Sequence, residues 1–534
     1  MRKLLRISRP LHLALLLGVG LLFQCRVEGH KSPSPSLESR INSQYSTRST
    51  SVNCIMKDFC FLRGGDTDTS IENSNDNALD FLNPIFEMYP HEPTFLQALT
   101  ELAQSLRPLF QNNENPKRAL YYQRALLLLA EPERIISFRV TWLDDDGTLQ
   151  INRGWRVEFN SALGPYKGGL RFHPSVNPDV LKFLGFEQVI KNALTGLSLG
   201  GGKGGSDFDP KGKSDAEIKR FCQAFMLELT KYIHPSTDVP AGDIGVGGRE
   251  IGYMVGQYKR LMNRHGEGIL TGKSEVLGGS PLRPEATGYG LVYITQLAIN
   301  DSSKRLSKVA PPLKKASCAI SGSGNVAQYA AKKLIEFGAK VVTMSDSSGT
   351  LAFDKGMTEE DLRAIFQGKQ VDRLRLSELE NQVSGQYIPA SSPWTMDTSI
   401  NIDYAFPCAT QNEINDVAAE RLIQNGLRGV FEGANLPVNI EGQATLRDHS
   451  NTVLYIPGKA ANAGGVGVSG FEMSQNAQKL AWSEEVVDQK LKDLMGYIYR
   501  QLVDAAGTDG TLEEGANAAG FLRVVDAMDQ LGWL

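Results

Sequence analysis

Three lysines lie close together in the sequence, and two of them are flanked by glycines. Lys167 lies in Gly164-Pro-Tyr-Lys-Gly-Gly, Lys203 lies in Gly200-Gly-Gly-Lys-Gly-Gly, and Lys191 lies between them. A surface lysine ordinarily covers apolar neighbours on a helix with its alkyl stem. Glycine flanks instead permit unusual backbone torsions and the close approach of a ligand, at an entropic cost. We therefore predict a site where a small, multiply charged anion meets ammonium and backbone groups together.

Crowded ammonium groups also favour proton-transfer chemistry. Three neighbouring cations lower the pKa of at least one of them from its reference of about 10.4. A lysine with a lowered pKa can accept and return a proton near neutral pH, and Lys203 is the best candidate for this role. Gln188 and Lys191 are three residues apart on a predicted helix, so both can reach one carboxylate. The alternative interpretation is three unrelated, solvated lysines.

An aspartate follows in the segment Asp238-Val-Pro-Ala-Gly-Asp243, with Gly242 before it and Gly245 two residues after it. In that setting Asp243 is either an ordinary turn residue or, if the lysines lie nearby, a proton relay. Its negative charge would also attract ammonium.

A dinucleotide site is predicted further along the chain. Gly322-Ser-Gly-Asn-Val-Ala327 lies between an apolar strand pattern and a helical pattern. Gly322 permits the tight turn, Gly324 lets a pyrophosphate approach the backbone at the positive end of the helix, and Ala327 allows close packing. Gly200, Gly202 and Gly205 show the same spacing, but Asp207-Phe-Asp-Pro follows them, so no helix can begin there and no nucleotide site is expected.

The next predicted strand ends in Ser345-Asp346-Ser347-Ser348-Gly349. An acid at this position usually accepts hydrogen bonds from the ribose hydroxyls of NAD and repels the 2'-phosphate of NADP. Three neighbouring hydroxyls could instead donate to that phosphate if Asp346 points away. The residues alone leave this choice open.

The elements that position these groups are predicted from periodicity. From Asn77 on, apolar residues at helical spacing predict amphipathic helices. Apolar and polar residues then alternate in 136–142 and 155–159, which predicts a hairpin around a turn at Asp144 to Gly147. Ser214 to Glu217 fits a capping box, and we expect the buried stripe of one helix behind it. The members of this stripe are Ile218, Phe221, Cys222, Phe225, Leu229, Tyr232 and Ile233. Beyond about residue 275, short strands alternate with helices, which predicts a parallel sheet covered on both faces.

Composition limits the possible partners. The chain has 534 residues and a net charge of −4, which gives no electrostatic reason to expect nucleic acid. No CxxC pair is present, and Cys222, Cys318 and Cys408 are far apart. We expect reduced core thiols, without a disulfide framework and without a metal site.

The N-terminus has the features of a targeting segment. Arg2, Lys3, Arg6 and Arg9 precede an apolar run at 11–23, which is short for a membrane span and has the layout of a secretory signal. The serine-rich, basic segment 30–57 resembles a transit peptide. Residues 1–70 are therefore expected to be a two-part presequence that is removed after directing the chain to an organelle through the secretory route, with a plastid suspected. Simple secretion and a mitochondrial presequence are the alternatives, and no stable membrane span is expected in the mature chain.

Several long motifs together resemble the hexameric glutamate dehydrogenase family, from about residue 77 to the C-terminus. They are Gly164 to Val176, Gly200 to Asp209, Asp238 to Asp243, Arg283 to Gly290 and Gly458 to Gly465. Ser321 to Ala327 with Ser345 to Gly349 looks like the NADP-specific branch. One departure is Ser198-Leu199, where we associate a Pro-Met pair with this branch, and it affects the wall of the pocket.

The patterns and the resemblance together imply an α/β protein of two domains separated by a catalytic cleft. Residues 75–275 are the predicted α/β substrate and oligomerisation domain. Residues 276–465 are the predicted Rossmann-like, doubly wound dinucleotide-binding domain. Residues 466–534 are predicted helices that return toward the substrate domain. The resemblance also implies a homohexamer.

The resemblance further implies a reaction and a role for each matching residue. The reaction is the reversible oxidative deamination of glutamate to 2-oxoglutarate and ammonium, with NADP as hydride acceptor and NAD less favoured. Lys203 would be the catalytic lysine and Asp243 the proton-transferring acid. The substrate-binding residues would be Lys167 and Ser469 for the side-chain carboxylate, Gln188 and Lys191 at the α-carboxylate, and Gly242 through its backbone. The cofactor-binding residues would be Thr287, Gly322, Gly324, Asn325, Ser345, Asp346 and, near the nicotinamide, Asn435.

Two rival functions remain for comparison. A dehydrogenase of apolar amino acids would lack a cation for a distal carboxylate, so Lys167 together with Ser469 favours glutamate. A catalytically silent, nucleotide-binding subunit would be expected to lack Lys203 or Asp243, and both are present.

Overall fold

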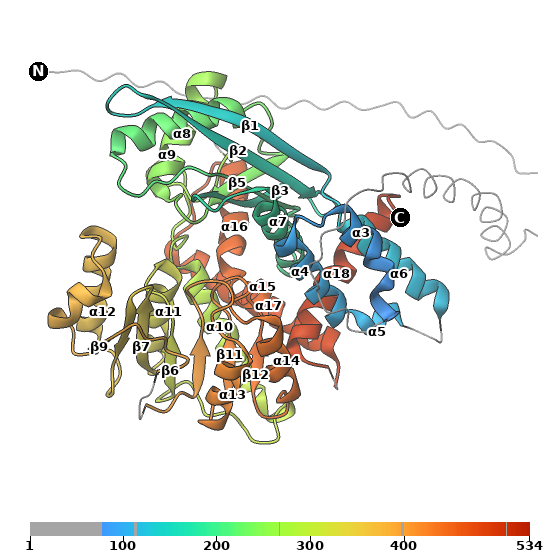
Figure 1. Ribbon diagram of the computed structural model, residues 1–534, viewed down its shortest axis with the longest axis vertical. Helices are drawn as coiled ribbons and strands as arrows, with labels where there is room; N and C mark the ends of the chain where they lie inside the picture. Colours follow the sequence, from blue (N-terminus) through green and yellow to red (C-terminus); the bar gives the residue numbers. More distant parts are fainter. Residues whose placement is uncertain (1–76, 112–114, 266–267, 397–399, 509) are drawn as a thin grey trace, which may run out of the picture. The chain divides into compact units, whose positions relative to one another are not determined.

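A computed structural model describes residues 77–534 apart from 112–114, 266–267, 397–399 and 509. The predicted presequence and the first three cysteines lie outside the described residues. The described part of the chain contains two β-sheets, one of five strands and one of seven, each with its own helices (Figure 1). The predicted fold class, two α/β domains, is confirmed; the exact domain boundaries stay predictions.

The first sheet has the strand order β1-β2-β4-β3-β5. Its strands are β1 (Arg134–Leu143), β2 (Leu149–Asn160), β3 (Tyr166–Phe172), β4 (Gly201–Ser206) and β5 (Asp238–Gly242). The predicted hairpin is confirmed, since β1 and β2 are antiparallel and Trp142 pairs with Gln150. Strand β3 runs parallel to both β4 and β5, so the three strands that carry predicted site residues lie side by side.

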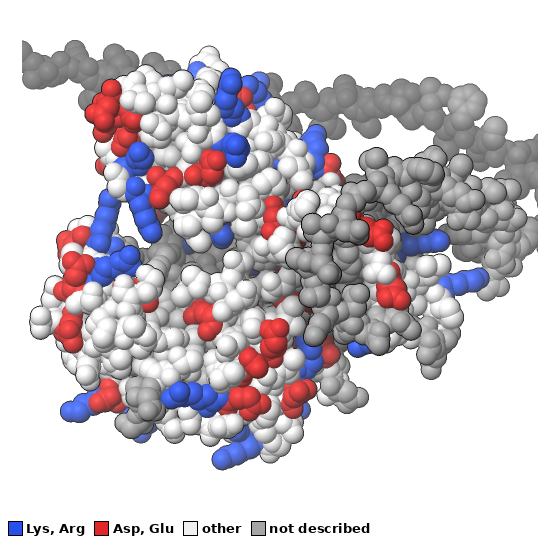
Figure 2. All heavy atoms as spheres, in the orientation of Figure 1, with Lys and Arg blue, Asp and Glu red and all other residues white. Residues whose placement is uncertain are grey.

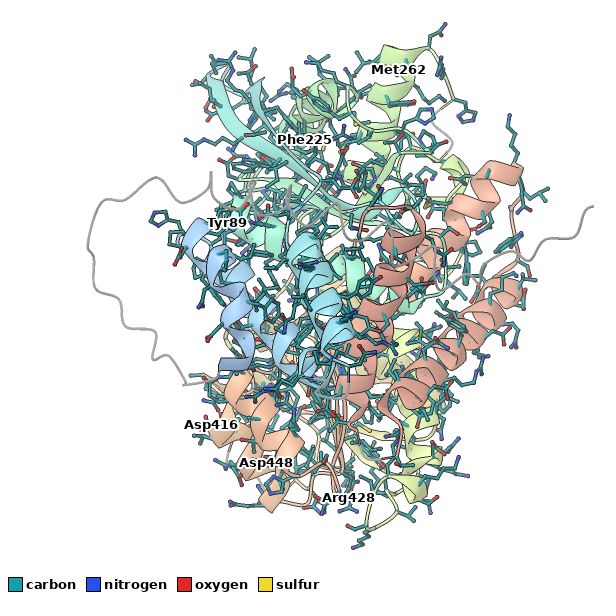
Figure 3. All side chains as sticks on the ribbon, turned by 90° about the vertical axis from the view of Figure 1, so that its right-hand side faces the viewer. Tyr89, Phe225, Met262, Asp416, Arg428 and Asp448 are labelled. Atoms are coloured by element: carbon teal, nitrogen blue, oxygen red, sulfur yellow. The ribbon has the colours of Figure 1, made fainter. Side chains whose placement is uncertain are left out.

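Helices cover this sheet and bury its apolar face. Helix α7 (Pro178–Leu194) begins behind Asn177, whose side chain accepts from Val180 N, and it packs on β2. Helix α8 (Asp215–Leu229) has the predicted capping box, and Phe225 lies in the core 5.3 Å from the ring of Phe138 on β1 (Figure 3). The other helices of this part are η1 (Asn77–Leu82), α3 (Asn83–Met88), α4 (Pro93–Ser105), α5 (Arg107–Phe110), α6 (Pro116–Leu129) and α9 (Gly248–Met262).

The predicted stripe of α8 is wrong at one residue. Ile218, Phe221 and Leu229 are buried, but Tyr232 is 42% exposed. The helix ends at Leu229, so the 3.6-residue period no longer determines which side chains beyond it face the core.

The second sheet has the order β12-β11-β10-β6-β7-β8-β9. Its strands are β6 (Ser317–Ile320), β7 (Lys340–Asp346), β8 (Gly349–Ala352), β9 (Gln386–Pro389), β10 (Tyr404–Phe406), β11 (Gly429–Phe431) and β12 (Leu454–Ile456). From β12 to β7 all neighbours are parallel, as predicted. The antiparallel strands β8 and β9 were not predicted, because each has only four residues and neither shows alternating apolar and polar side chains.

Helices lie on both faces of the second sheet, as expected for a doubly wound fold (Figure 1). Residues of α10 and α11 share one core cluster with Tyr404 and Phe406, and residues of α13 and α14 share another with Ala405. The helices are α10 (Ala286–Asn300), α11 (Asn325–Glu336), α12 (Glu359–Phe366), α13 (Asp416–Gln424), α14 (Ile440–Asp448) and α15 (Gly458–Ala461). Successive side chains of β10 therefore point to opposite faces of the sheet and pack against the helices on each face.

The chain ends in three long helices, α16 (Gly464–Gln478), α17 (Glu484–Ala506) and α18 (Leu512–Gln530). Helix α18 contacts the helices of the first sheet: Asn517 Nδ2 donates to Ser105 Oγ at 2.7 Å, and Arg523 donates to the carbonyl of Gly196 at 2.9 Å. The last helices thus reach back to the domain with the predicted substrate residues. None of the described helices is long and apolar enough to cross a membrane.

Surface charge and cysteines are unremarkable in the described part of the chain. Figure 2 shows acidic and basic side chains interspersed over one face of the molecule. Cys222 and Cys318 are buried free thiols, and Cys408 is a partly buried one, which agrees with the expectation of reduced thiols for these three.

The glycines around Lys203 serve packing. The sequence was interpreted as a place where glycine lets a ligand approach, and that explanation is wrong for β4. A Cβ at Gly201 would lie 2.8 Å from Val189 Cα of α7, and one at Gly204 would lie 3.0 Å from Arg156 Cδ. The strand is buried throughout. Glycine is needed here because a helix and a buried arginine approach the strand.

Candidate active site

The predicted catalytic pair is in contact. Lys203 projects from β4, Asp243 directly follows β5, and Lys203 Nζ lies 3.1 Å from Asp243 Oδ2. Gly169 of β3 lies between them: a Cβ at this position would be 2.8 Å from Asp243 Cβ and 3.4 Å from Lys203 Nζ. The parallel strands therefore bring the two groups together, and the glycine between them leaves the space that the pair needs.

The electrostatics of this pair differ in cause from the sequence-based prediction. Burial is the main reason that the pKa of Lys203 is lowered, and the Asp243 carboxylate partly offsets it. Burial by itself would raise the pKa of Asp243, but the charges of Lys203 and Arg171 hold that pKa well below its usual range. Crowding of cations contributes, yet removal from water is the larger effect.

Helix α7 supplies the next two predicted residues. Lys191 Nζ donates to Asn435 Oδ1 at 2.7 Å, and burial, followed by the charge of Lys203, lowers the pKa of Lys191 to about 8. Gln188 Nε2 donates to Asn192 Oδ1 at 2.7 Å, one helical turn away. A Cβ at Gly168 would lie 3.4 Å from Gln188 Cγ, so Gln188 lies beside the strand that carries Lys167.

Lys167 and Ser469 meet around an arginine that the sequence did not single out. Lys167 is 1% exposed, and burial, then the charge of Arg283, lowers its pKa well below the usual value. Arg283 Nε donates to Ser469 Oγ at 2.9 Å. The sequence did show a cation at the start of the motif Arg283 to Gly290. Its partner Ser469 is 186 residues away, so the sequence could not predict their contact.

These cations have no carboxylate of their own. Glu472 lies one helical turn after Ser469, but it pairs with Lys273 at 2.6 Å and accepts from Gly272 N at 2.9 Å. Within the described residues neither Lys167 nor Arg283 forms an ion pair, although the charge of Glu472 raises the pKa of both. Since buried charges are ordinarily paired, this corner is suited to an anionic group of a ligand.

The glycine turn of the second sheet has the predicted geometry. Gly322 adopts φ +80° between β6 and α11, which favours glycine, and Ala327 is fully buried. A Cβ at Gly324 would meet nothing within 4 Å, so space lies open at the start of α11. Asn325 Nδ2 donates to the carbonyl of Pro284 at 2.5 Å.

Thr287 and Gly242 lie at two other edges of the site. Thr287 is on α10 and faces α16: a Cβ at Gly465 would lie 2.3 Å from Thr287 Oγ1. Gly242 ends β5, where it pairs with Leu170 and directly precedes Asp243. The structure thus places Gly242 beside the catalytic pair and Thr287 at the helix interface of the second domain.

The end of β7 is arranged around hydrogen bonds that sequence reasoning missed. Ser345 Oγ accepts from Gly322 N at 3.0 Å and so supports the glycine turn. The Asp346 carboxylate accepts from two backbone groups, Ser348 N at 2.8 Å and Leu376 N at 3.0 Å. Each of its oxygens therefore already accepts one hydrogen bond from the protein backbone.

Two cationic side chains, Arg375 and Lys369, lie near the end of β7. Arg375 Nη1 donates to Ser347 Oγ at 2.9 Å. Lys369 Nζ donates to the carbonyl of Leu374 at 2.9 Å, and burial, opposed by the charge of Asp346, lowers its pKa. Neither was predicted, because both lie in a segment without a recognisable motif.

Asn435 joins the two domains. Its Oδ1 accepts from Lys191 of the first domain and from Asn462 Nδ2, at 3.1 Å, of the second. A second contact crosses nearby, where Lys459 Nζ lies 3.3 Å from Glu187 Oε1. Of the predicted residues, Asn435 and Lys191 thus connect the cofactor group and the substrate group directly.

Family models match most of the chain. A model described as "Glu/Leu/Phe/Val dehydrogenase, dimerisation domain" matches residues 132–260, and one described as "Glutamate/Leucine/Phenylalanine/Valine dehydrogenase" matches residues 278–532. The chain belongs to this dehydrogenase family. The two matches fall on the two sheets and leave the N-terminal segment unmatched.

Relatives within the family are similar over nearly their whole length. An NADP-specific glutamate dehydrogenase of Escherichia coli K12 is 50% identical over 451 residues, which cover 84% of this chain and 97% of the relative. One of Neurospora crassa is 51% identical over 462 residues, covering 83% and 98%. The crystal structure of Plasmodium falciparum glutamate dehydrogenase matches with a TM-score of 0.79 and 46% identity, covering 88% of this chain and all of that one.

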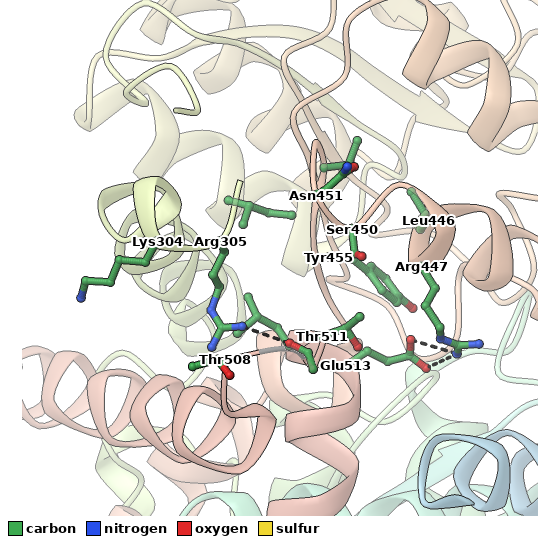
Figure 4. A pocket seen from close by; sticks show the side chains of 14 residues that line it. Lys304, Arg305, Leu446, Arg447, Ser450, Asn451, Tyr455, Thr508, Thr511 and Glu513 are labelled. Carbon is green, nitrogen blue, oxygen red and sulfur yellow. Dashed lines mark hydrogen bonds and ion pairs between the residues drawn. The ribbon is translucent and has the colours of Figure 1, made fainter. Parts of the chain in front are cut away.

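A cavity of about 200 Å³ lies away from the predicted active site. It is bounded by α14, η3 (Ser302–Lys304) and the start of α18 (Figure 4). Its arginines already have partners: Arg447 Nη2 lies 3.0 Å from Glu513, and Arg305 donates to the carbonyl of Gly510 at 3.2 Å. No predicted site residue lines it. Among the residues that the structure describes, no group of three or more His, Cys, Asp or Glu side chains is arranged to hold a metal ion.

Proposed function

We propose that this chain is an NADP-dependent glutamate dehydrogenase, which interconverts L-glutamate with 2-oxoglutarate and ammonium. The observation that carries the proposal is the 2.7 Å hydrogen bond from Lys191 to Asn435, which joins the predicted substrate group to the predicted cofactor group. Its support is the family membership and the relatives named NADP-specific glutamate dehydrogenase at about 50% identity.

Substrate choice follows from the buried Lys167 and the partly buried Arg283. A distal carboxylate of glutamate would lie at Lys167, Arg283 and Ser469, which have no carboxylate partner within the described residues. An apolar side chain would leave these charges unpaired at a large free-energy cost. Gln188, Lys191 and the backbone of Gly242 are left for the α-carboxylate end.

The residues around the glycine turn fit NADP. Open space at Gly324 and the start of α11 suit a pyrophosphate, and Ser347 with Arg375 and Lys369 suits a 2'-phosphate. The Asp346 carboxylate is held by two backbone N–H groups, and these bonds fix its orientation beside the cations that would bind the phosphate. Thr287, Asn325 and Asn435 would hold the rest of the cofactor, which supplies hydride acceptance and donation when bound.

Proton transfer is assigned to the Lys203 and Asp243 pair. With its lowered pKa, Lys203 can take a proton from the water that attacks the iminium carbon of the substrate. Asp243 accepts from Lys203 and can pass protons to and from ammonia as it leaves. Lys203 is buried and Asp243 is partly buried, which strengthens the interaction between their charges.

The direct test is the initial rate of the purified protein with 2-oxoglutarate and ammonium, measured separately with NADPH and NADH. We expect turnover with NADPH and much slower turnover with NADH. No turnover with either cofactor would contradict the function and favour a silent subunit, whereas preference for NADH would contradict the assignment of Arg375 and Lys369. Lys203→Ala should abolish turnover while it leaves NADPH binding, measured by fluorescence titration, nearly unchanged.

Specificity is tested by removing the distal cation and hydroxyl. Lys167→Leu combined with Ser469→Val should weaken 2-oxoglutarate far more than an apolar 2-oxo acid, because only the former has a distal carboxylate. The ratio of kcat/KM values for the two acids measures this. An equal loss for both acids would rule out the carboxylate assignment.

We also propose a homohexamer and an organelle address. The family match named a dimerisation domain covers strand β1, a free edge of the first sheet, and Ile151 on its partner strand is 63% exposed. Light scattering coupled to gel filtration should give the mass of six chains. A fluorescent protein fused behind residues 1–70 should locate to a plastid, and secretion or mitochondrial import would replace that proposal.

A further inference from the structure

Arg171 contacts the predicted proton-transfer pair directly. It lies on β3, the strand between those that position Lys203 and Asp243. Its Nε lies 2.9 Å from Asp243 Oδ2, the same oxygen that Lys203 Nζ approaches to 3.1 Å. The side chain is 12% exposed. One carboxylate oxygen therefore receives two cations of different chemistry.

We propose that Arg171 is a positioning residue for proton transfer: its guanidinium stays on the Asp243 oxygen as a permanent cation when Lys203 loses its proton. This rests on the proposed function, in which Lys203 must become neutral during each turnover.

The physical argument compares the two cations. A guanidinium is always charged in proteins, while a buried ammonium titrates readily. If Lys203 were the only partner of Asp243, its deprotonation would leave an ionised carboxylate unpaired in a nearly buried site, which is costly. With Arg171 present, the carboxylate keeps a charge-assisted hydrogen bond and its orientation. The neutral form of Lys203 is then reached more easily.

The other charged groups around the pair already have partners. Arg156, from β2, makes two hydrogen bonds with Asp238 at 2.7 and 2.5 Å. Lys191, from α7, donates to Asn435. The charges of Arg156 and Arg171 both lower the pKa of Lys203, and the charge of Arg171 also lowers the pKa of Asp243. Among the described groups, Arg171 is the permanently charged one that is bound to Asp243.

The role can be tested without relying on turnover. In the full-length protein, the pH dependence of acetylation of Lys203 by acetic anhydride, quantified on its peptide by mass spectrometry, reports the pKa of that amine. Arg171→Gln should raise this pKa by about one unit, since a cation next to the amine is lost. Arg171→Lys carries an ammonium that can itself lose its proton, so the rise in the pKa of Lys203 should be smaller than in Arg171→Gln but still present. Arg153→Gln, an exposed arginine on the same sheet, should leave the pKa of Lys203 unchanged.

Kinetics provide the second measurement. The rising limb of kcat/KM for glutamate against pH should move to higher pH in Arg171→Gln by the same amount as the labelling pKa. A folded Arg171→Gln protein, checked by circular dichroism, with an unchanged Lys203 pKa would overturn the proposal. If the glutamine variant does not fold, Arg171→Met keeps the length of the stem and decides in the same way. A parent protein without glutamate turnover would contradict the proposed function, while the labelling experiment would still decide whether Arg171 controls the pair.

Discussion

At the scale of single residues, the site consists of cations that have been removed from water. Lys167, Lys191 and Lys203 are each less than 10% exposed, and burial is the leading reason that each has a lowered pKa. A buried lysine without an anion favours its neutral form. The charge on these groups is therefore expected to depend on whether a dicarboxylate is bound.

The affinity for 2-oxoglutarate should therefore depend on pH. A bound carboxylate raises the pKa of Lys191 above its free value of about 8. Below that pH the amine is already charged; above it, binding must also capture a proton, so affinity should fall as the pH rises from 8 toward the pKa of the complex. Isothermal titration calorimetry at pH 7, 8 and 9 in the presence of NADPH measures this.

The control for this prediction is Lys191→Met. It should bind more weakly at pH 7 and show a shallower fall between pH 8 and 9, because the titrating group has been removed. An equally steep fall in the variant and the parent would show that Lys191 is not the group responsible.

At the scale of elements, the site depends on how closely α7 approaches β4. Gly201 is the contact point, where a Cβ would lie 2.3 Å from Val189 Cγ2. Because Gln188 and Lys191 belong to the same helix, a shift of α7 away from β4 would move both groups relative to Lys203. The packing of α7 and the geometry of the predicted site therefore both involve Gly201.

Gly201→Ala should destabilise the protein by about 1–3 kcal/mol, as overpacking of a close contact does, and should lower kcat as α7 moves. Gly256→Ala is the matched control: Gly256 lies inside α9, is exposed, and its Cβ would meet nothing within 4 Å. That change should stabilise the helix by up to about 1 kcal/mol. Thermal unfolding and steady-state rates measure both, and equal effects of the two substitutions would contradict the packing argument.

At the scale of the whole described chain, a few buried polar contacts cross between the two sheets. Lys191 with Asn435, and Glu187 with Lys459, both connect α7 to the second domain. Lys273, which lies between the two family matches, forms an ion pair with Glu472 on α16. These contacts lie beside the predicted site, so they set how the substrate residues face the cofactor residues.

A double-mutant cycle tests the pair Glu187 and Lys459. Glu187→Gln and Lys459→Met should each reduce the free energy of unfolding by about 3–5 kcal/mol, since each leaves a buried charge without its partner. The double variant should lose less than the sum, because neither charge remains. Chemical denaturation gives the three values, and strict additivity would show that the two side chains are not coupled in solution.

Local structure was largely predictable from the sequence because its signals lie within a few residues. The capping box at Ser214, the hairpin turn before Gly147 and the glycine turn at Gly322 each follow from short-range sterics and hydrogen bonding. Tyr232 was misplaced because helical periodicity does not show where a helix ends. Strands β8 and β9 were missed because four residues without alternating apolar and polar side chains give too little periodicity.

The amino-acid sequence was enough to predict two α/β domains and the glycine turn at Gly322. It also showed which lysines and which aspartate could transfer protons or bind an anion. The contacts between side chains that are far apart in the sequence became clear only from the fold. Lys191 and Asn435 are 244 residues apart, and Arg283, Arg375 and Arg171 acquire their partners from other segments. The sequence also could not show that Gly201 of β4 allows the close approach of helix α7. A glycine indicates that a side chain would not fit, but it does not indicate which group lies there. Contacts between remote segments depend on how sheets and helices pack, and residue spacing does not encode that arrangement.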